Sequence, residues 1–439
     1  MRKRIVLKFG GTSMGSADAM RKAGAIVRSV DGEAVVVVSA VSGTTDALIA
    51  LGRAAVGGGD WEAALNEIRT RHAAIVASLG LDVGLKDFWS EMEQICQGVA
   101  QFGELTPSIL DRLLSLGERL STAIFAACLN ADGTRAEMVD AFHVVATDRQ
   151  FGSANVDFAL TNARAAEVLS PMLAASVVPV VTGFVGRSDS NRYTTLGRGG
   201  SDYSAAIVAA AVDATELQIW TDVDGMFTAD PRLIPAATAL PQLSYAEAGE
   251  LAYFGAKVLH PKTIKPAIER GIPVRVLNTF HAEAPGTLIT SEKRPSLKSV
   301  TSRKGITVLN IDALPMLGAS GFLGTVGDAF RRHQVVVDVL ASSEVSISVT
   351  VDQAFPEALL DDLRAFATVD VDPHKAIICL VGEGIRTDLD VLWKLFYAVR
   401  TIPIRMVSQG ASQRNITFAV AETDADFAVR QVFQAFFNS

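Results

Sequence analysis

The sequence has few cysteines and no long apolar run. Its three cysteines, Cys96, Cys128 and Cys379, are far apart and form no C-x-x-C spacing, which indicates neither a disulfide framework nor a zinc site. No apolar stretch is long enough to span a bilayer. The apolar stretch after the basic opening residues ends at Lys8, too early for a signal peptide. We therefore expect a cytoplasmic protein with buried thiols.

An excess of positive charge is also absent. The net charge is -8 at pH 7, so no general attraction to nucleic acids or anionic membranes exists, and we expect no partner of either kind. A nucleotide would have to be held by a local site.

The 439 residues, 49% of them hydrophobic, can form a large core and are too many for one ordinary domain. A soluble enzyme of two or three domains fits this composition.

Short β-branched segments alternate with longer helical patterns through the first two-thirds of the chain. This alternation is typical of βαβ units around a mostly parallel sheet. The predicted strands are Ile5–Phe9, Ala34–Ser39, Val177–Thr182, Leu217–Thr221 and Pro273–Leu277. The predicted helices include Trp61–Leu79, Ser108–Leu129, Ser201–Val212 and Pro261–Arg270, several of which begin with a Ser or Pro that favours a helix start. We expect a layered α/β domain in residues 1–292.

The last third of the chain contains an internal repeat. Around Ser291–Lys304 the sequence becomes polar, basic and serine-rich, which predicts an interdomain linker. Beyond it, Gly321–Val351 and Asp390–Val420 both have the pattern helix, strand, serine-containing turn, strand. We therefore expect two small α+β modules, the first with the linker in residues 293–374 and the second in 375–439.

A glycine-rich segment, Lys8-Phe9-Gly10-Gly11-Thr12-Ser13, stands where the first predicted strand ends. Adjacent glycines let backbone amides approach an anion closely, and a lysine before them adds a charge suited to phosphate. The segment is not a P-loop, because Ser16 stands where that motif needs lysine. A glycine turn with a solvated lysine is the alternative.

A second glycine-rich segment, Leu196-Gly197-Arg198-Gly199-Gly200-Ser201-Asp202, leads directly into a predicted helix. Unpaired amides and the positive helix end would there face a phosphate. Arg198 could form paired hydrogen bonds with a carboxylate or phosphate. Asp202 is equally well explained as a helix cap, so the segment alone leaves both interpretations open.

Two further segments, 221–232 and 254–261, combine glycine with charged residues at element ends, where the ligands of open α/β sheets collect. Plain turns would also explain them. Lys8, Arg198 and Lys257 supply positive charge, whereas His143 and His260 are lone histidines, which are more often structural. Phosphoryl transfer to a carboxylate, with a pKa of about 4, needs positioning and positive charge but no base. The pattern favours such a transfer.

Together these segments resemble the aspartate kinases of the amino-acid kinase family. KFGGTS, GRGGSD, TDVDG…DPR and FGAKVLHP occur in the family's order and spacing, and the C-terminal repeat resembles the tandem ACT modules of the monofunctional, lysine-sensitive type. The resemblance covers essentially the whole chain. It implies a three-layer αβα kinase domain followed by two ferredoxin-like ACT modules. It also implies phosphorylation of the L-aspartate side chain by ATP to 4-phospho-L-aspartate, the first step toward diaminopimelate, lysine, threonine and methionine, with Mg²⁺ bound mainly through the ATP phosphates.

The resemblance also implies site residues. Lys8, Asp202 and Lys257 would be catalytic, with Lys8 stabilising the transferred phosphoryl group and Asp202 orienting the lysines and substrate. Arg198 would bind the α-carboxylate of aspartate and Glu118 its α-ammonium, and Thr45 and Ser201 would line the same pocket. The nucleotide would contact Lys8, Gly10, Gly11, Thr221, Asp222, Phe227, Arg232 and Lys257. Because Phe227 replaces a tyrosine common in the family, we expect weaker ATP binding without loss of activity.

An effector site is implied in the first ACT module, with lysine the expected effector and threonine the alternative. It would comprise Met316, Gly321, Phe322, Leu323, Asp338, Ser343, Glu344 and Val345. A solvated loop is the other explanation of the acidic pair Asp338 and Glu344. The second module has Arg405 and Gln413 at the corresponding places, so we expect it to be structural or dimer-forming, with its last strand supplied by residues 300–312. The resemblance implies a homodimer through these modules, or a tetramer.

Two other functions stay open. Another kinase of the same fold, acting on glutamate, acetylglutamate or a nucleoside monophosphate, typically lacks both KFGGTS and tandem ACT modules. A catalytically silent amino-acid sensor would bind ligands without turnover, although Lys8, Arg198, Asp202 and Lys257 are all present. We also expect no fused homoserine dehydrogenase. Aspartate-dependent ATP turnover would distinguish the kinase from the sensor.

Overall fold

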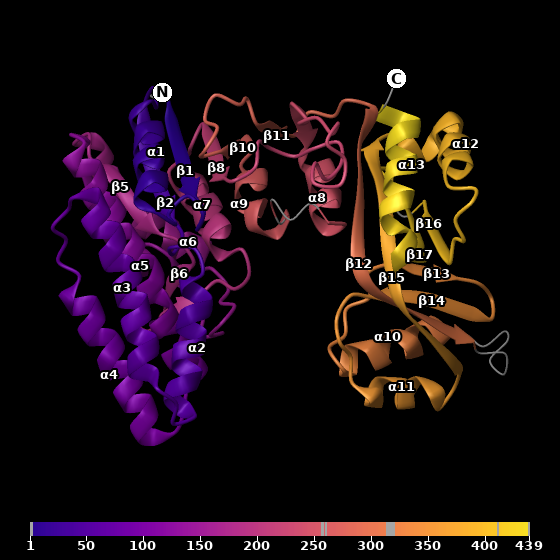
Figure 1. The fold of residues 1–439 in the computed structure, drawn as a ribbon, viewed down its shortest axis with the longest axis horizontal. Helices are drawn as coiled ribbons and strands as arrows, with labels where there is room; N and C mark the ends of the chain where they lie inside the picture. The colour runs from indigo at the N-terminus through magenta and orange to yellow at the C-terminus, as the bar shows by residue number, and fades with distance from the viewer. Residues whose placement is uncertain (1–2, 256–258, 260, 313–320, 411, 438–439) are drawn as a thin grey trace. The chain divides into compact units, whose positions relative to one another are not determined.

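The computed structural model describes residues 3–255, 259, 261–312, 321–410 and 412–437, which form two compact units (Figure 1). The first unit comprises Met1–Met226, Pro241–Tyr245 and Val258–Glu292, and the second comprises Phe227–Leu240, Ala246–Lys257 and Lys293–Ser439. Within the described residues, no helix has the length and apolar character needed to cross a membrane. All three cysteines are buried free thiols, as predicted.

The first unit is built on an eight-stranded sheet with the order β3-β5-β2-β1-β8-β10-β11-β9. The strands from β3 to β10 are parallel, and β11 is antiparallel to β10. All five predicted strands are present within one residue of their predicted bounds. The strands are β1 Arg4–Phe9, β2 Glu33–Val38, β3 Ala136–Val139, β5 Val178–Thr182, β8 Glu216–Thr221, β9 Gln242–Ser244, β10 Val274–Asn278 and β11 Thr287–Thr290, with a small second sheet of β4 Ala146–Thr147, β6 Val185–Ser188 and β7 Tyr193–Thr195.

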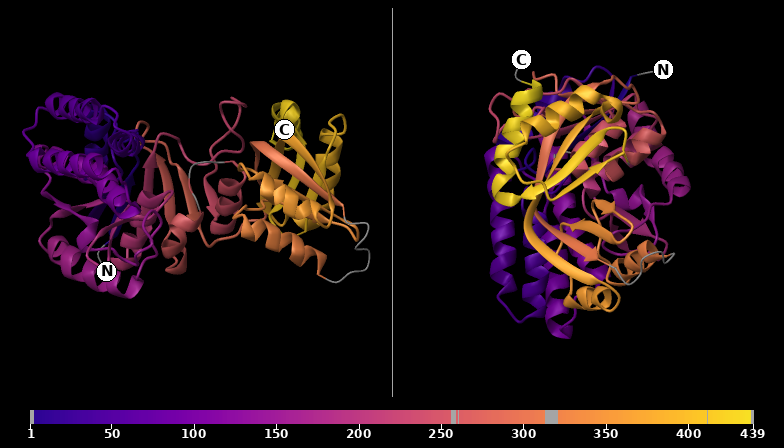
Figure 2. Two further views of the ribbon diagram at one scale, coloured as in Figure 1. Left: turned by 90° about the horizontal axis from the view of Figure 1, so that it is seen from below. Right: turned by 90° about the vertical axis from the view of Figure 1, so that its right-hand side faces the viewer.

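Helices cover both faces of this sheet, which makes the three-layer αβα sandwich. Leu7 and Phe9 of β1 share one core with α1, α2 and α5, whereas α7 packs on β1 from the opposite face. Helices α3, α4 and α5 run side by side (Figures 1 and 2). The helices of this unit are α1 Ala17–Arg28, α2 Thr44–Val56, α3 Trp61–Leu79, α4 Lys86–Phe102, α5 Pro107–Ala131, η1 Ala141–His143, α6 Phe158–Ala174, α7 Gly200–Ala211, η2 Pro261–Ile264 and α9 Lys265–Glu269. Helix α8, Tyr245–Tyr253, belongs to the second unit from Ala246 onward.

One predicted helix is divided. Pro261–Arg270 forms the short η2 followed by α9 rather than one helix. Pro266 lies in the first turn of α9, where it lacks the N–H that would continue the hydrogen-bond ladder from the preceding turn. The prediction of a single helix was therefore wrong at this proline.

The second unit contains one six-stranded antiparallel sheet, ordered β13-β14-β12-β15-β17-β16. The long strands β12 and β15 are the two central strands, and they pair with each other from one end of the sheet to the other (Figures 1 and 2). One end of β12 contributes Val300 to one core, and the other contributes Leu309 to a second core. The elements are β12 Ser296–Asp312, α10 Phe322–Arg332, β13 Leu340–Ser342, β14 Ser346–Val351, α11 Glu357–Arg364, β15 Thr368–Glu383, η4 Ile385–Thr387, α12 Leu389–Ala398, β16 Met406–Gln409, β17 Asn415–Ala421, η5 Glu422–Asp424 and α13 Ala425–Phe437.

The predicted internal repeat is confirmed by matching elements and hydrogen bonds. α10, β13 and β14 correspond to α12, β16 and β17. The amide of Asp338 donates to the carbonyl of Thr350 at 2.9 Å, and the amide of Arg405 donates to that of Ala419 at 2.8 Å. Arg405 therefore occupies the place of Asp338 in the second copy.

The predicted linker at Ser291–Lys304 is wrong from Ser296 onward, where β12 begins. Val300 is fully buried. The hydroxyls of Ser299 and Thr301 donate to the carbonyls of Phe227 and Phe254 at 2.9 and 3.2 Å. The polar residues of this stretch thus bond to neighbouring backbone instead of water, because a buried carbonyl needs a donor.

Candidate active site

An ion pair links β1 to the first turn of α7. Lys8 is only 8% exposed, and its Nζ lies 2.6 Å from Oδ1 of Asp202. Because side chains alternate along a strand, Lys8 faces α7 while Leu7 and Phe9 enter the other core. The N-cap of α7 is Gly199 in the left-handed conformation, without a side-chain cap. Asp202 is therefore paired with Lys8 rather than capping the helix, and Lys8 is not a solvated lysine.

The glycine-rich segment after β1 joins the ends of three strands. The Gly10 amide donates to the carbonyl of Trp220 at the end of β8, at 3.1 Å. The carbonyl of Gly11 accepts from the Ser42 amide beyond β2, also at 3.1 Å. A Cβ at position 10 would lie 3.6 Å from Nζ of Lys8. The two glycines thus lie beside the lysine head at the carboxyl edge of the parallel sheet, where ligands of open α/β sheets bind.

Glu118 of α5 reaches the same edge from the other face. It is 3% exposed, and its Oε1 accepts from the Ala40 amide at 3.3 Å. Its Oε2 is buried and has no hydrogen-bond partner in the described part of the chain. Burial raises the pKa of Glu118 to about 8, against the opposing effects of its hydrogen bonds and the charge of Lys8. A buried oxygen without a donor indicates a place for a cationic or hydrogen-bonding ligand.

The remaining predicted aspartate contacts surround this edge. Gly183 follows β5, and a Cβ there would lie 2.8 Å from the Cβ of Ser201, so only glycine allows this approach. Arg198 is exposed and pairs with no carboxylate among the described residues. Thr45 is half-buried in the first turn of α2. The structure thus supplies a serine, an arginine and a threonine in segments that meet the ends of β2, β5 and α5.

The predicted nucleotide contacts divide between the two units. Thr221 ends β8 and donates its hydroxyl to Asp222 at 3.1 Å. Phe227 and Arg232 belong to the second unit, where Arg232 is highly exposed and lies 2.7 Å from Asp230. Lys257 lies outside the described residues, as does His260. His143 ends η1 and is exposed, with its ring edge against Phe142.

The described effector residues lie at the start of α10, just before β13 and in the β13–β14 turn of the second unit. The side chain of Asp338 is 3% exposed, Tyr253 Oη donates to it at 2.9 Å, and Arg303 lies 3.3 Å away. Arg303 also pairs with Asp352. Burial raises the pKa of Asp338, opposed by Tyr253 and Arg303. Gly321, Leu323, Ser343 and Glu344 are exposed, Phe322 and Val345 are half-buried, and Met316 lies outside the described residues.

In the second module, the turn between β16 and β17 corresponds to the β13–β14 turn, and it contacts α8. Ser412 and Asn415, which correspond to Ser343 and Ser346, donate to the two carboxylate oxygens of Glu250 at 2.7 and 2.6 Å. These bonds tie this turn to α8. They support a structural role for the second copy.

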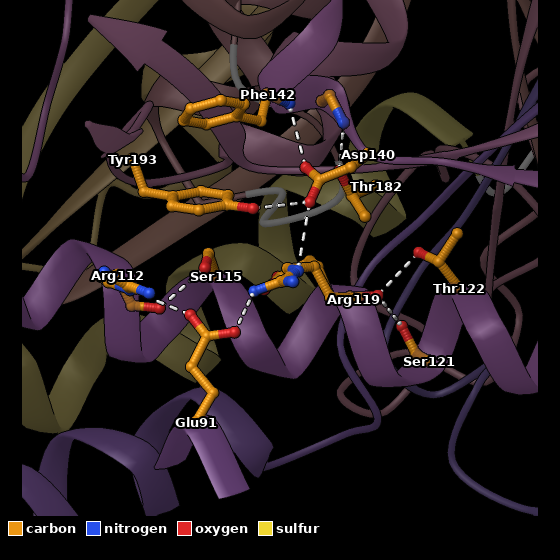
Figure 3. A network of polar contacts seen from close by, with 12 residues as sticks. Glu91, Arg112, Ser115, Arg119, Ser121, Thr122, Asp140, Phe142, Thr182 and Tyr193 are labelled. Atoms are coloured by element: carbon orange, nitrogen blue, oxygen red, sulfur yellow. Dashed lines mark hydrogen bonds and ion pairs between the residues drawn. The ribbon is translucent and has the colours of Figure 1, made fainter. Parts of the chain in front are cut away.

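Sequence reasoning missed several groups at the site. Gly183 could have been found, since it follows a predicted strand directly. The Ala40 amide carried no signal, because any residue supplies an amide. Arg119, next to Glu118, anchors a network with Glu91, Asp140 and Tyr193 (Figure 3). No motif marks these residues, because charged side chains on amphipathic helices are usually solvated.

Comparisons with known proteins cover the whole chain. Residues 3–278 match the amino acid kinase family, and residues 378–436 match an ACT domain. The chain is 38% identical to chloroplastic aspartokinase 1 of Arabidopsis thaliana, covering 99% of this chain and 80% of that protein. It is 35% identical to lysine-sensitive aspartokinase 3 of Escherichia coli (strain K12), covering 100% of both. The crystal structure of E. coli aspartokinase III with aspartate and ADP (R-state) aligns with a TM-score of 0.87 at 34% identity, covering 99% of this chain and 100% of that chain. The crystal structure of the same enzyme with lysine and aspartate (T-state) aligns with a TM-score of 0.82 at 35% identity, covering 99% of both chains.

Proposed function

Because this chain belongs to the amino acid kinase family, we propose that it is an aspartate kinase, which transfers the γ-phosphoryl group of ATP to the side-chain carboxylate of L-aspartate. The product is 4-phospho-L-aspartate, the first intermediate toward lysine, threonine and methionine. The observation that carries this proposal is the Lys8–Asp202 pair at the carboxyl edge of the sheet, beside Glu118 with its unpaired oxygen. We propose a catalytic domain within residues 1–292, of which 227–240 and 246–257 pack with the second unit, followed by ACT modules in 293–374 and 375–439.

Lys8 stabilises the negative charge that spreads over the phosphoryl oxygens during transfer. The attacking carboxylate is already ionised at neutral pH, so the site needs no base. Asp202 holds the Lys8 ammonium in place by the 2.6 Å contact and orients the substrate. By the family resemblance, Lys257, which lies outside the described residues, would add a second positive charge at the phosphates. Positioning and electrostatic stabilisation therefore account for the chemistry.

Aspartate is held by its two α-substituents. Its α-ammonium lies against Glu118, where it supplies the donor that Oε2 lacks. Its α-carboxylate lies against Arg198, whose guanidinium suits a two-point contact. Thr45 and Ser201 line the pocket.

ATP is bound through Lys8, Gly10, Gly11, Thr221, Asp222, Phe227, Arg232 and Lys257. Magnesium accompanies the nucleotide. In the described part of the chain no three acidic, histidine or cysteine side chains gather into a metal site. The ion would therefore be held mainly by the phosphates and would neutralise their charge during transfer.

Lysine is the proposed feedback inhibitor, and Asp338 is its proposed ammonium-binding group, with threonine the alternative effector. The carboxylate of Asp338 is held by Tyr253 and Arg303 in this structure. An incoming ammonium must therefore compete with the Tyr253 hydroxyl or share the carboxylate with it.

The change Tyr253→Phe is expected to strengthen inhibition by lysine, because it removes a competing donor to Asp338. Removing one competing hydrogen bond should lower the lysine concentration for half-inhibition about threefold to tenfold. Inhibition curves at fixed aspartate and ATP measure this effect. Tyr397→Phe, on the exposed face of α12, is the matched control. Unchanged lysine potency in Tyr253→Phe would contradict the competition, and retained inhibition in Asp338→Ala would remove Asp338 from the effector site.

The ACT modules would form a homodimer, or a tetramer, in the cytoplasm. The proposal includes neither a nucleic-acid nor a membrane partner. A silent amino-acid sensor is the competing function, because the same fold could bind aspartate and lysine without turnover.

The deciding experiment measures ADP release from Mg-ATP with and without L-aspartate, with L-lysine and L-threonine titrated in parallel. Aspartate-dependent release that lysine suppresses is expected. Release no higher than in Asp202→Ala would reject the kinase and leave the sensor. Turnover with glutamate in place of aspartate would indicate a different kinase of the family.

A further inference from the structure

A cluster of charged side chains adjoins Glu118 on α5 (Figure 3). Nη1 of Arg119 lies 2.9 Å from Oε2 of Glu91 on α4, and its Nε lies 3.1 Å from Oδ2 of Asp140. The three side chains are only 15%, 18% and 13% exposed. A guanidinium held by two carboxylates from different elements fixes those elements relative to each other.

Aromatic rings and further hydrogen bonds complete the cluster. The Arg119 guanidinium lies 5.1 Å from the ring centre of Phe88 and 5.2 Å from that of Tyr193. The Tyr193 hydroxyl donates to Asp140 at 2.8 Å. Nε of Arg112 donates to Glu91 at 2.9 Å. Two arginines thus balance two carboxylates, although Nε of Arg119 lies near Asp140 without hydrogen-bond geometry.

The elements that the cluster joins lead to the residues proposed to bind aspartate. The amide of Ala141 in η1 donates to Oγ1 of Thr182 at the end of β5, at 2.7 Å, and Ser201 packs against the next residue of that segment. Tyr193 begins β7, which leads into the segment carrying Arg198. The cluster therefore connects three sides of the proposed pocket.

We propose that Arg119 is a positioning residue for aspartate binding: by bridging Glu91 and Asp140 it fixes the rotation of α5, and thereby the direction of Glu118. Adjacent residues on a helix project about 100° apart, so the rotation that sets one also sets the other. If α5 turned, the Glu118 carboxylate would leave the Ala40 amide and the site of the α-ammonium. This inference rests on the proposed function.

Two variants test the positioning role. Arg119→Lys keeps the charge but cannot bridge both carboxylates, because an ammonium lacks the planar fork. Tyr193→Phe removes one oxygen and keeps the ring. The KM for aspartate is expected to rise about tenfold in Arg119→Lys, which breaks the bridge itself, and about threefold in Tyr193→Phe, which removes one hydrogen bond beside it. The KM for ATP and kcat should change less than about twofold, since neither contact touches the phosphates.

Arg149→Lys is the matched control, since Arg149 pairs with Asp189 in an exposed position outside the cluster. A lower melting temperature in both variants with an unchanged KM for aspartate would overturn the positioning role and leave a structural one. The unmodified protein is assayed first. If it shows no aspartate-dependent turnover, the proposed function fails; if it turns over and both variants keep its KM, only the positioning role fails.

Discussion

Replacing Lys8 by alanine is expected to lower kcat by about 10³-fold, the largest effect of any single change in this protein. Loss of one preorganised donor to transition-state charge costs about 10² to 10³ in rate in other enzymes, and a full positive charge on a transferring phosphoryl group should be at the upper end. Asp202→Asn should lower kcat less, by about 10²-fold, because Lys8 remains but loses its partner. Steady-state rates of ADP release at saturating aspartate and ATP measure both.

Stability must be separated from catalysis in these variants. Lys8 and Asp202 are both largely buried, so removing one partner leaves an unpaired buried charge, which costs about 3 kcal/mol or more. The double variant Lys8→Met with Asp202→Asn removes both charges and should recover most of that stability, because a neutral pair of similar volume is tolerated. Its activity should not recover. A double variant that regained turnover together with its melting temperature would show that the pair is structural.

The Lys8–Asp202 contact illustrates how far sequence reasoning reached. The apolar stretch that predicts β1 and the glycine-rich start that predicts α7 are both local patterns, and both were placed within one residue of their observed starts. That the two meet depends on which face of β1 Lys8 occupies and on α7 packing against that face. Neither follows from local pattern, so the sequence alone leaves Asp202 open between a helix cap and a functional residue. The contact with Lys8 at 2.6 Å and the N-cap at Gly199 argue against the cap, and the catalytic role stays a proposal.

The linker prediction failed for a related reason. Composition around Ser296–Lys304 is that of a solvated segment, yet β12 pairs along its whole length with β15. The serine and threonine hydroxyls there serve backbone carbonyls of segments 227–240 and 246–257, which join the second unit although they precede it in the chain. Long-range packing overrides local composition in such cases.

Arg119 and its partners represent the part of the site that could not be predicted. Arg119 is one of many charged residues on long helices, and its partners come from α4, from the turn before η1 and from β7. Only the folded arrangement distinguishes it from an exposed arginine such as Arg149. The roles assigned to Arg198, Thr45 and the nucleotide contacts stay predictions, and the variants above address the residues around them.

Glu118→Gln is expected to lower kcat/KM for aspartate by about 10²-fold, because it removes the charge that binds the α-ammonium from a fully buried position.

The pH dependence of kcat/KM provides the sharper test of this role of Glu118. The pKa of Glu118 is raised to about 8 by burial, so the free enzyme must lose this proton before it binds the ammonium. In the parent protein kcat/KM for aspartate should rise with pH up to about 8, reporting a free-enzyme group. In Glu118→Gln this rise should disappear, while kcat/KM for ATP keeps its profile.

The same group makes a stability prediction of definite sign. An unfolded glutamate has a pKa of about 4.3, so between that value and about 8 the folded protein binds more protons than the unfolded chain. The contribution of Glu118 to the free energy of unfolding is fully present below the pKa of the unfolded chain. It is lost as the pH rises to the pKa of the folded protein. Glu118→Gln has no such group, so it should be more stable than the parent at pH 8.5, and the difference should shrink at pH 5.5. Urea denaturation midpoints of the two ligand-free proteins measure this. A substitution that weakens aspartate binding yet stabilises the fold would identify Glu118 as a residue kept for its ligand, whereas a destabilised Glu118→Gln at pH 8.5 would mean that its carboxylate is held by the protein itself.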